Sequence, residues 1–105
     1  MTVLLVHCSC PDAETAARIA RVLVEERLAA CVNRIEGVRS TYQWQGTVAD
    51  EAEVMLVIKT TLERFDELRE RIVALHPYEL PEVIAVEVVA GLDRYLDWVS
   101  AQTRE

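Results

Sequence analysis

Sulfur and imidazole side chains are the groups of this sequence best suited to hold a metal ion. Cys8 and Cys10 lie two residues apart in a strand-like stretch, so both would point to one face of a sheet. His7 would point to the other face, which argues against a chelate made by His7 and Cys8. Thiolates favour Cu(I), whereas imidazole and oxygen ligands favour Cu(II). The simpler interpretation of Cys8 and Cys31 is a small buried hydrophobic residue, and the sequence leaves the roles of Cys10 and Cys31 open.

A lysine and a tyrosine could bind a small ligand. Lys59 ends an otherwise apolar strand, where a charge is costly unless it meets an opposite charge. It could pair with Glu53, with Glu82, with an anionic ligand or with a neighbouring subunit. Tyr78 could stack on such a ligand. We therefore predict a ligand cleft that uses Lys59, Tyr78 and Glu82, whereas the acidic residues at 50–53 are most simply a solvated run of charge.

Motifs of known enzymes are missing. The sequence has no HExxH, no phosphate-binding P-loop, no dinucleotide fingerprint and no nucleophile motif. We therefore expect a protein that is not an enzyme.

The composition predicts a single domain over residues 1–105, because single domains commonly run about 100–150 residues. The formal charge of −7 argues against a nucleic-acid or anionic-membrane surface, both of which need clustered Lys and Arg. No apolar run approaches the roughly 20 residues of a membrane span, and the first residues lack the basic start of a signal peptide. Three cysteines make a poor disulfide framework and favour a reducing cytoplasm.

A long hairpin must position several of these residues. From Cys31 to Gln45, apolar or aromatic residues recur at every second position, and the phase changes at Gly37. This alternation predicts a half-buried strand, and the glycine at the phase change predicts a bulge. Because strands usually run about five or six residues, this arm should extend beyond its own sheet. Tyr42 and Trp44 near its end then need another surface, which favours a subunit interface over ligand stacking.

The remaining patterns alternate between strands and helices. We expect strands at 3–8, 31–45, 53–59 and 83–89, and helices from residue 12 to about 28, from 62 to 76 and from 92 to 99. This order predicts a ferredoxin-like split βαβ fold, a four-stranded antiparallel sheet with two helices on one face. The other face would stay apolar and uncovered, which predicts self-association.

Three local expectations can be checked against a structure. The first helix should bury one stripe of side chains, Ala16, Ile19, Ala20, Leu23 and Val24. The second helix should begin at a capping box of Thr60 and Glu63. Glu67 and Arg71 should form an ion pair along that helix.

Five motifs together resemble the CutA divalent-cation tolerance family. They are LAACVN at 28–33, STYQWQG at 40–46, IKT at 58–60, HPYELPE at 76–82 and YLDW at 95–98. They follow the family's order and spacing over nearly the whole chain. The resemblance implies a cytoplasmic homotrimer, similar to the PII signalling proteins, in which each hairpin extends onto a neighbour.

The resemblance also implies a role in tolerance of copper and other divalent metals. The copper ligands proposed for the family correspond to Cys8 and to a histidine pair at 75–76, of which this chain keeps only His76 because residue 75 is leucine. One cysteine and one histidine per subunit need carboxylates, water or another subunit to complete a site. The purely structural interpretation of His76 is a residue at the end of a helix that contacts the terminal carbonyl groups. The alternative function is a PII-like regulator that binds a small anionic ligand between subunits.

Overall fold

The computed structural model describes residues 1–104. Its elements are β1 (Val3–Cys10), α1 (Ala13–Glu25), β2 (Cys31–Trp44), β3 (Thr47–Thr61), α2 (Leu62–Leu75), β4 (Ile84–Glu87) and α3 (Asp93–Gln102). This order confirms the predicted succession of strands and helices. The fourth strand is shorter than the predicted 83–89, and the first strand continues two residues past Cys8 to Cys10.

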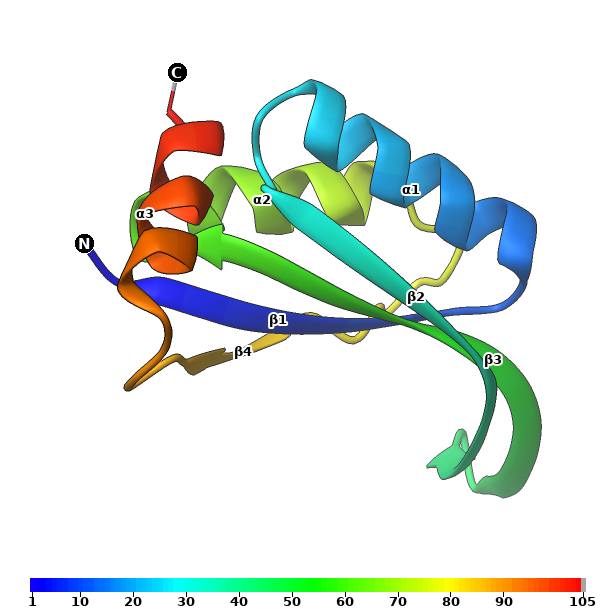
Figure 1. Cartoon of the computed structure of the whole chain (residues 1–105). Helices are drawn as coiled ribbons and strands as arrows, with labels where there is room; N and C mark the ends of the chain where they lie inside the picture. Colours follow the sequence, from blue (N-terminus) through cyan, green and yellow to red (C-terminus); the bar gives the residue numbers. More distant parts are fainter. Residues whose placement is uncertain (105) are drawn as a thin grey trace.

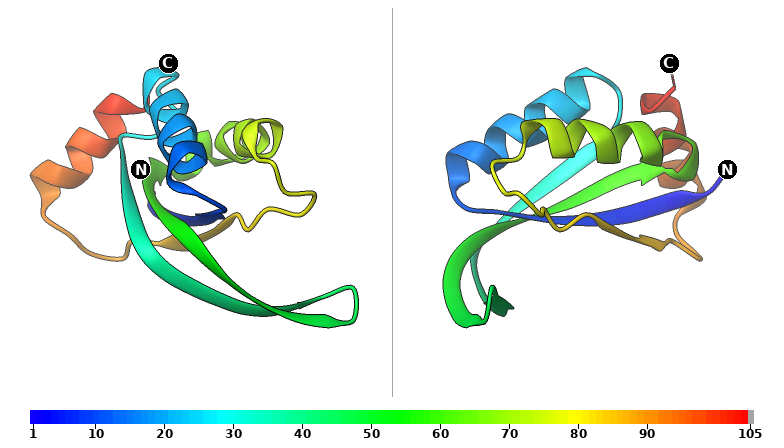
Figure 2. Two further views of the ribbon diagram at one scale, coloured as in Figure 1. Left: turned by 90° about the vertical axis from the view of Figure 1, so that its right-hand side faces the viewer. Right: turned by 180° about the vertical axis from the view of Figure 1, so that it is seen from behind.

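The strands form one antiparallel sheet in the order β2-β3-β1-β4. Helices α1 and α2 lie side by side on one face of this sheet, and α3 stands at one end of it (Figures 1 and 2). The ferredoxin-like arrangement predicted from the sequence is therefore confirmed, with a third helix added at the C-terminal end.

The hairpin of β2 and β3 reaches well beyond the sheet and curls away from the helices (Figure 1). The register between its strands shifts between Ile35 and Val38, and Gly37 at that point has φ +83°. Only glycine adopts such a backbone conformation without strain, so the predicted bulge is confirmed together with its cause. At the far end, Gln45 and Gly46 also have positive φ, of 49° and 81°, which closes the hairpin in a tight turn.

The core lies between the sheet and the helices. From α1 it receives Thr15, Ala16, Ile19 and Leu23, whereas Val24 stays 43% exposed. The predicted stripe was therefore wrong at Val24, and it placed Ala20, which is half-buried, too deep. The stripe is centred on Ile19 and Leu23, and Val24 lies at its edge, beside a surface hollow that it shares with Ala20 and Val32.

The start of α2 also differs from the expectation. Thr60 still belongs to β3, and its Oγ1 donates a hydrogen bond of 2.6 Å to the Leu28 carbonyl in the core. Thr61 is the N-cap residue, and its side chain makes no capping bond. The capping-box prediction was wrong because the Thr60 hydroxyl is already bonded to the buried Leu28 carbonyl and cannot cap the helix.

The predicted ion pair of Glu67 and Arg71 was also wrong. Arg71 instead reaches across to α1 and makes a two-pronged contact with Glu26, with its Nε at 2.9 Å from Oε1 and its Nη2 at 2.9 Å from Oε2. Glu67 pairs with Arg64 at 3.0 Å. A planar guanidinium gains more from two parallel bonds to one carboxylate than from a single contact along its own helix.

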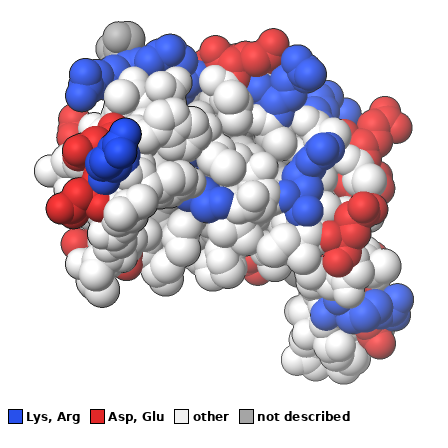
Figure 3. Space-filling view, in the orientation of Figure 1, with Lys and Arg blue, Asp and Glu red and all other residues white. Residues whose placement is uncertain are grey.

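The sheet face opposite the helices carries many apolar side chains. Leu5, His7, Met55 and Val57 alternate onto this face and stay partly exposed, while Ile35, Ile84 and Val86 are 48%, 59% and 60% exposed. We call these seven residues the open face. Figure 3, which looks onto the β2 edge of the sheet, shows charged side chains of both signs along the helices and a mostly uncharged area below them. Within residues 1–104, no helix is long and apolar enough to cross a membrane.

Candidate functional site

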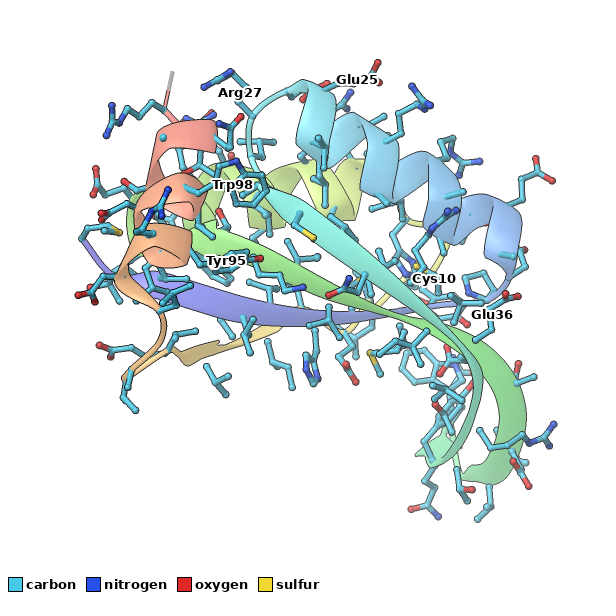
Figure 4. The ribbon with its side chains drawn as sticks, in the orientation of Figure 1. Cys10, Glu25, Arg27, Glu36, Tyr95 and Trp98 are labelled. Atoms are coloured by element: carbon cyan, nitrogen blue, oxygen red, sulfur yellow. The ribbon has the colours of Figure 1, made fainter. Side chains whose placement is uncertain are left out.

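Two cysteines and one histidine meet in the core at one end of the sheet. Cys8 and Cys10 point from β1 toward the helices and are fully buried, and His76 follows the last turn of α2 and is 7% exposed. The sulfur atoms and a ring nitrogen of His76 all lie within 4.8 Å of one another. In Figure 4, Cys10 lies at the end of β1 beneath α1. We call these three residues the thiol–imidazole cluster.

Hydrogen bonds fix the His76 ring in this cluster. The backbone N–H of Tyr78 donates to Nδ1 at 3.1 Å, so this nitrogen carries no proton. Nε2 therefore carries the proton and donates to the Ser9 carbonyl at 2.8 Å. The purely structural interpretation placed His76 against the terminal carbonyl groups of its helix. The ring instead bonds to the strand that holds both cysteines, which holds it beside their sulfur atoms.

The two thiols lie close enough to shift each other's pKa. The hydrogen bond between them and burial raise the pKa of Cys8 far above its usual range, and the charges of Cys10, Glu82 and Glu53 raise it further. The same bond lowers the pKa of Cys10. Cys10 is accordingly the thiol of the pair that ionises first. A soft cation that bound both sulfur atoms would displace the proton of Cys8, and it would meet in Cys10 the thiol that gives up its proton more easily.

A cavity of about 510 Å³ lies next to the cluster, between the curled end of the hairpin and residues 76–82. The left view of Figure 2 shows this segment directly above the hairpin. Its walls carry three aromatic rings and two carboxyl groups, with Ser9, Ser40, Thr41, Tyr42, Gln43, Trp44, Glu53, Tyr78, Leu80 and Glu82 as the lining residues. Ser9 belongs both to this wall and to the hydrogen bond that fixes His76.

The predicted ligand residues lie in two places within one chain. Tyr78 and Glu82 line the cavity, and Tyr42 and Trp44 form its other wall, about 40% exposed each. Lys59 lies on the open side of the sheet opposite Leu5, and its ammonium donates to the Asn33 side chain. A cleft that uses Lys59 with Tyr78 therefore needs a second subunit and stays a prediction.

Cys31 is not the deeply buried residue that its simpler interpretation implied. It is half-buried, and its sulfur lies 3.8 Å from the Lys59 ammonium. Tyr95 and Trp98 extend from α3 toward this end of β2, and their ring centres are 5.6 Å apart (Figure 4). This environment is far from the thiol–imidazole cluster along β2 and β3, so Cys31 is a natural control for it.

Sequence reasoning missed two residues of the site. Cys10 was left without a role, although its spacing from Cys8 already placed both thiols on one face. Glu53 was assigned to a solvated run of charge, but it is 7% exposed and accepts a 2.7 Å hydrogen bond from the Tyr78 hydroxyl. The sequence pattern could have shown this, because Glu53 alternates with Met55 and Val57 along β3 and so lies on the same face of the sheet.

Comparison with known proteins gives a consistent result. The model of the CutA1 divalent ion tolerance protein family matches residues 4–102. A divalent-cation tolerance protein CutA from Thermus thermophilus is 50% identical over 93 residues, which cover 89% of this chain and 90% of that protein. The Escherichia coli protein of the same name is 38% identical over 98% of this chain and 92% of that one. The chain spans 53–65% of the length of the plant and animal relatives it matches, for example 56% of the Arabidopsis thaliana protein.

Solved structures agree with the sequence relatives. The Thermus thermophilus structure superposes with a TM-score of 0.95 at 46% identity, over 97% of this chain and 99% of that one. The CutA1 structure from Oryza sativa gives 0.97 at 40% identity, over 100% and 96%. Since the family model, the relatives and the fold all cover nearly the whole chain, this protein belongs to the CutA1 divalent ion tolerance family.

Proposed function

We propose that this divalent-cation tolerance protein binds a metal ion directly at the thiol–imidazole cluster. The observation that supports the proposal is the convergence of Cys8, Cys10 and His76 within 4.8 Å in a buried site. The sequence offered only two of these groups as ligands, and two ligands are too few for a stable site. Cys10 supplies the third ligand, where a leucine at position 75 has taken the place of a second histidine.

Copper is the metal that this donor set suits best. Two thiolates and one imidazole are a soft set of ligands, and such a set favours Cu(I) over the harder divalent ions. Zn²⁺ is the second candidate, because it also accepts cysteine and histidine but usually takes four ligands. Binding would require His76 to release one of its two hydrogen bonds, either the one from Tyr78 or the one to Ser9.

The proposal is tested by metal titration of the reduced protein without oxygen. We expect one Cu(I) per chain, and we expect Cys8→Ser, Cys10→Ser and His76→Ala each to lower the affinity by at least about a hundredfold, since even indirect contacts to a metal commonly matter ten- to a hundredfold. Cys31→Ser removes a thiol outside the cluster and should leave binding unchanged. Unchanged stoichiometry and affinity in all three cluster variants would exclude this site.

We also propose that the protein is a homotrimer. The support is the open face, whose exposed apolar side chains are more than an isolated chain usually tolerates. Tyr42 and Trp44 on the projecting hairpin are the residues that we expect at the interface. Light scattering at dilute concentration should give three times the chain mass of 11.9 kDa, and a monomer would contradict the proposal.

A cytoplasmic location completes the proposal. Its support is chemical, because three free cysteines, two of them in a cluster that must stay reduced to bind copper, suit a reducing compartment. Fractionation of cells that produce the tagged protein tests this, and recovery from an oxidising compartment would contradict it.

A further inference from the structure

The cavity between the hairpin and residues 76–82 has the chemistry of a site for a positively charged organic molecule. Its lining residues include Glu53 and Glu82 and no Lys, Arg or His side chain. Three aromatic rings, of Tyr42, Trp44 and Tyr78, line the same space. In the proposed trimer the cavity would therefore border the subunit interface, where Tyr42 and Trp44 are expected. Its volume of about 510 Å³ falls within the range of small-molecule pockets, roughly 300–1,000 Å³.

Glu53 is the residue whose situation most needs a cation. It is 7% exposed, and within residues 1–104 it forms no ion pair with a Lys, Arg or His side chain. Its one hydrogen bond to another side chain comes from the neutral Tyr78 hydroxyl. A buried carboxylate is costly without an opposite charge, so a positive group in the cavity would relieve a cost already present in the fold.

Three carboxylates lie in or beside the cavity, those of Glu53, Glu82 and Glu51. Burial and the hydrogen bond to Glu53 raise the pKa of Tyr78, and the nearby charge of Glu51 adds to this effect. The hydrogen bond to Glu51, at 2.6 Å, likewise raises the pKa of Tyr42. The rings of Tyr42, Trp44 and Tyr78 line the cavity, and the faces of such rings are electron-rich and attract cations.

We infer that this cavity binds an organic ammonium ion, with Glu53 as its counter-charge and Trp44, Tyr42 and Tyr78 as an aromatic enclosure. The sequence had suggested an anionic ligand for Tyr78 and Glu82, with Lys59 as the attracting charge. Lys59 contacts Asn33 instead and does not line the cavity. The carboxylates of the lining therefore favour a cationic ligand over an anionic one. A bare metal ion fits less well, because a hard cation needs several oxygen ligands and much of this lining consists of aromatic rings.

The test uses the fluorescence of Trp44. Trp98→Phe leaves Trp44 as the single tryptophan, and Trp98 lies on α3 away from the cavity. We would titrate this variant with tetramethylammonium, butylammonium and 1,4-diaminobutane. The matched controls are tert-butanol and 1-butanol, which resemble the first two ions but carry no charge, and sodium acetate as an anion. Saturable changes are expected with the ammonium ions only.

Single substitutions then locate the binding. Glu53→Gln should weaken ammonium binding about ten- to a hundredfold, because the counter-charge is lost and, for butylammonium and 1,4-diaminobutane, a charged hydrogen bond is lost with it. Trp44→Leu, measured by calorimetry, should weaken it about three- to thirtyfold. Glu70→Gln removes the same charge from an exposed position on α2 and should change nothing. Circular dichroism shows which variants keep the fold, so that a lost signal is not confused with unfolding.

Three outcomes would overturn the inference. The first is equal binding of the uncharged controls, and the second is an equal effect of Glu70→Gln and Glu53→Gln. In the third, no ammonium ion binds and Glu53→Gln dissociates the oligomer. That result would show that a cationic side chain of a neighbouring copy occupies the cavity. None of these outcomes bears on copper binding, which Cys8→Ser and Cys10→Ser test separately.

Discussion

The pH dependence of metal binding gives the sharpest test of the thiol–imidazole cluster. In the metal-free protein, Cys8 keeps its proton at all ordinary pH values, because its bond to Cys10 and its burial raise its pKa far above the usual range. Metal binding through this sulfur must expel that proton. The reaction therefore becomes more favourable as the pH rises, and it does not level off near the pKa of a free thiol.

The size of the effect follows from the number of protons released. Each proton changes the binding free energy by about 1.36 kcal/mol per pH unit. One proton from Cys8 gives about 2.7 kcal/mol between about pH 6 and pH 8, which is about a hundredfold in affinity. The pKa of Cys10 is lowered, so on metal binding this thiol adds less to the proton release than Cys8 does.

The assay is competition against a coloured Cu(I) chelator of known proton affinity, without oxygen, at several pH values. The logarithm of the association constant should rise by about one per pH unit for the wild type. Cys8→Ser should bind more weakly and lose most of this slope, whereas Cys31→Ser should keep both. A pH-independent affinity in the wild type, or an unchanged slope in Cys8→Ser, would refute the assignment of Cys8 as a protonated ligand.

Three further predictions concern the fold that positions the site, each measured by chemical unfolding. Gly37→Ala should lower stability by about 1–2 kcal/mol through backbone strain alone, since no atom lies within 4 Å of the added methyl group; an unchanged midpoint would contradict a required positive φ. Thr60→Val should cost about 1–3 kcal/mol, because the Leu28 carbonyl loses its buried partner, whereas Thr60→Ser should stay close to wild type. Ile72→Ala, at a fully buried position of α2, should cost about 2–5 kcal/mol, and Val73→Ala on the exposed side serves as its control.

The sequence predicted the fold well because its patterns are governed by burial. Alternating residues along Cys31–Gln45 predicted both the long strand and, through Gly37, the position of its bulge. The strand was expected to be half-buried, but most of it is exposed in the single chain. The errors arose where two structures compete for one side chain. Thr60 could cap a helix or bond inside a sheet, and Arg71 could pair along its helix or across to α1. Only the arrangement in space decides between such contacts, because their energies are alike.

The site was predicted less completely than the fold. Cys8 and His76 were expected from family resemblance, and the alternation of β1 already placed Cys10 on the same face as Cys8. What the sequence could not give was the distance between β1 and the end of α2, which depends on how α2 packs. Glu53 was misplaced because charge near a hairpin usually means solvent. Here the segment that follows α2 folds back over it and brings Tyr78 into contact.

One segment connects the two proposed sites. His76 belongs to the thiol–imidazole cluster, and Tyr78, two residues later, lines the cavity while its N–H holds the His76 ring. The carboxylates of the cavity, Glu53 and Glu82, also raise the pKa of Cys8. A cation beside them would offset their charge and make the Cys8 proton easier to displace. Binding free energies are reciprocal, so an ammonium ion in the cavity and copper in the cluster should each strengthen the binding of the other wherever this proton is the dominant cost. Direct repulsion between the two cations would weaken this coupling. The charge of Glu53 acts on both effects, because it raises the pKa of Cys8 and it screens the repulsion between the cations.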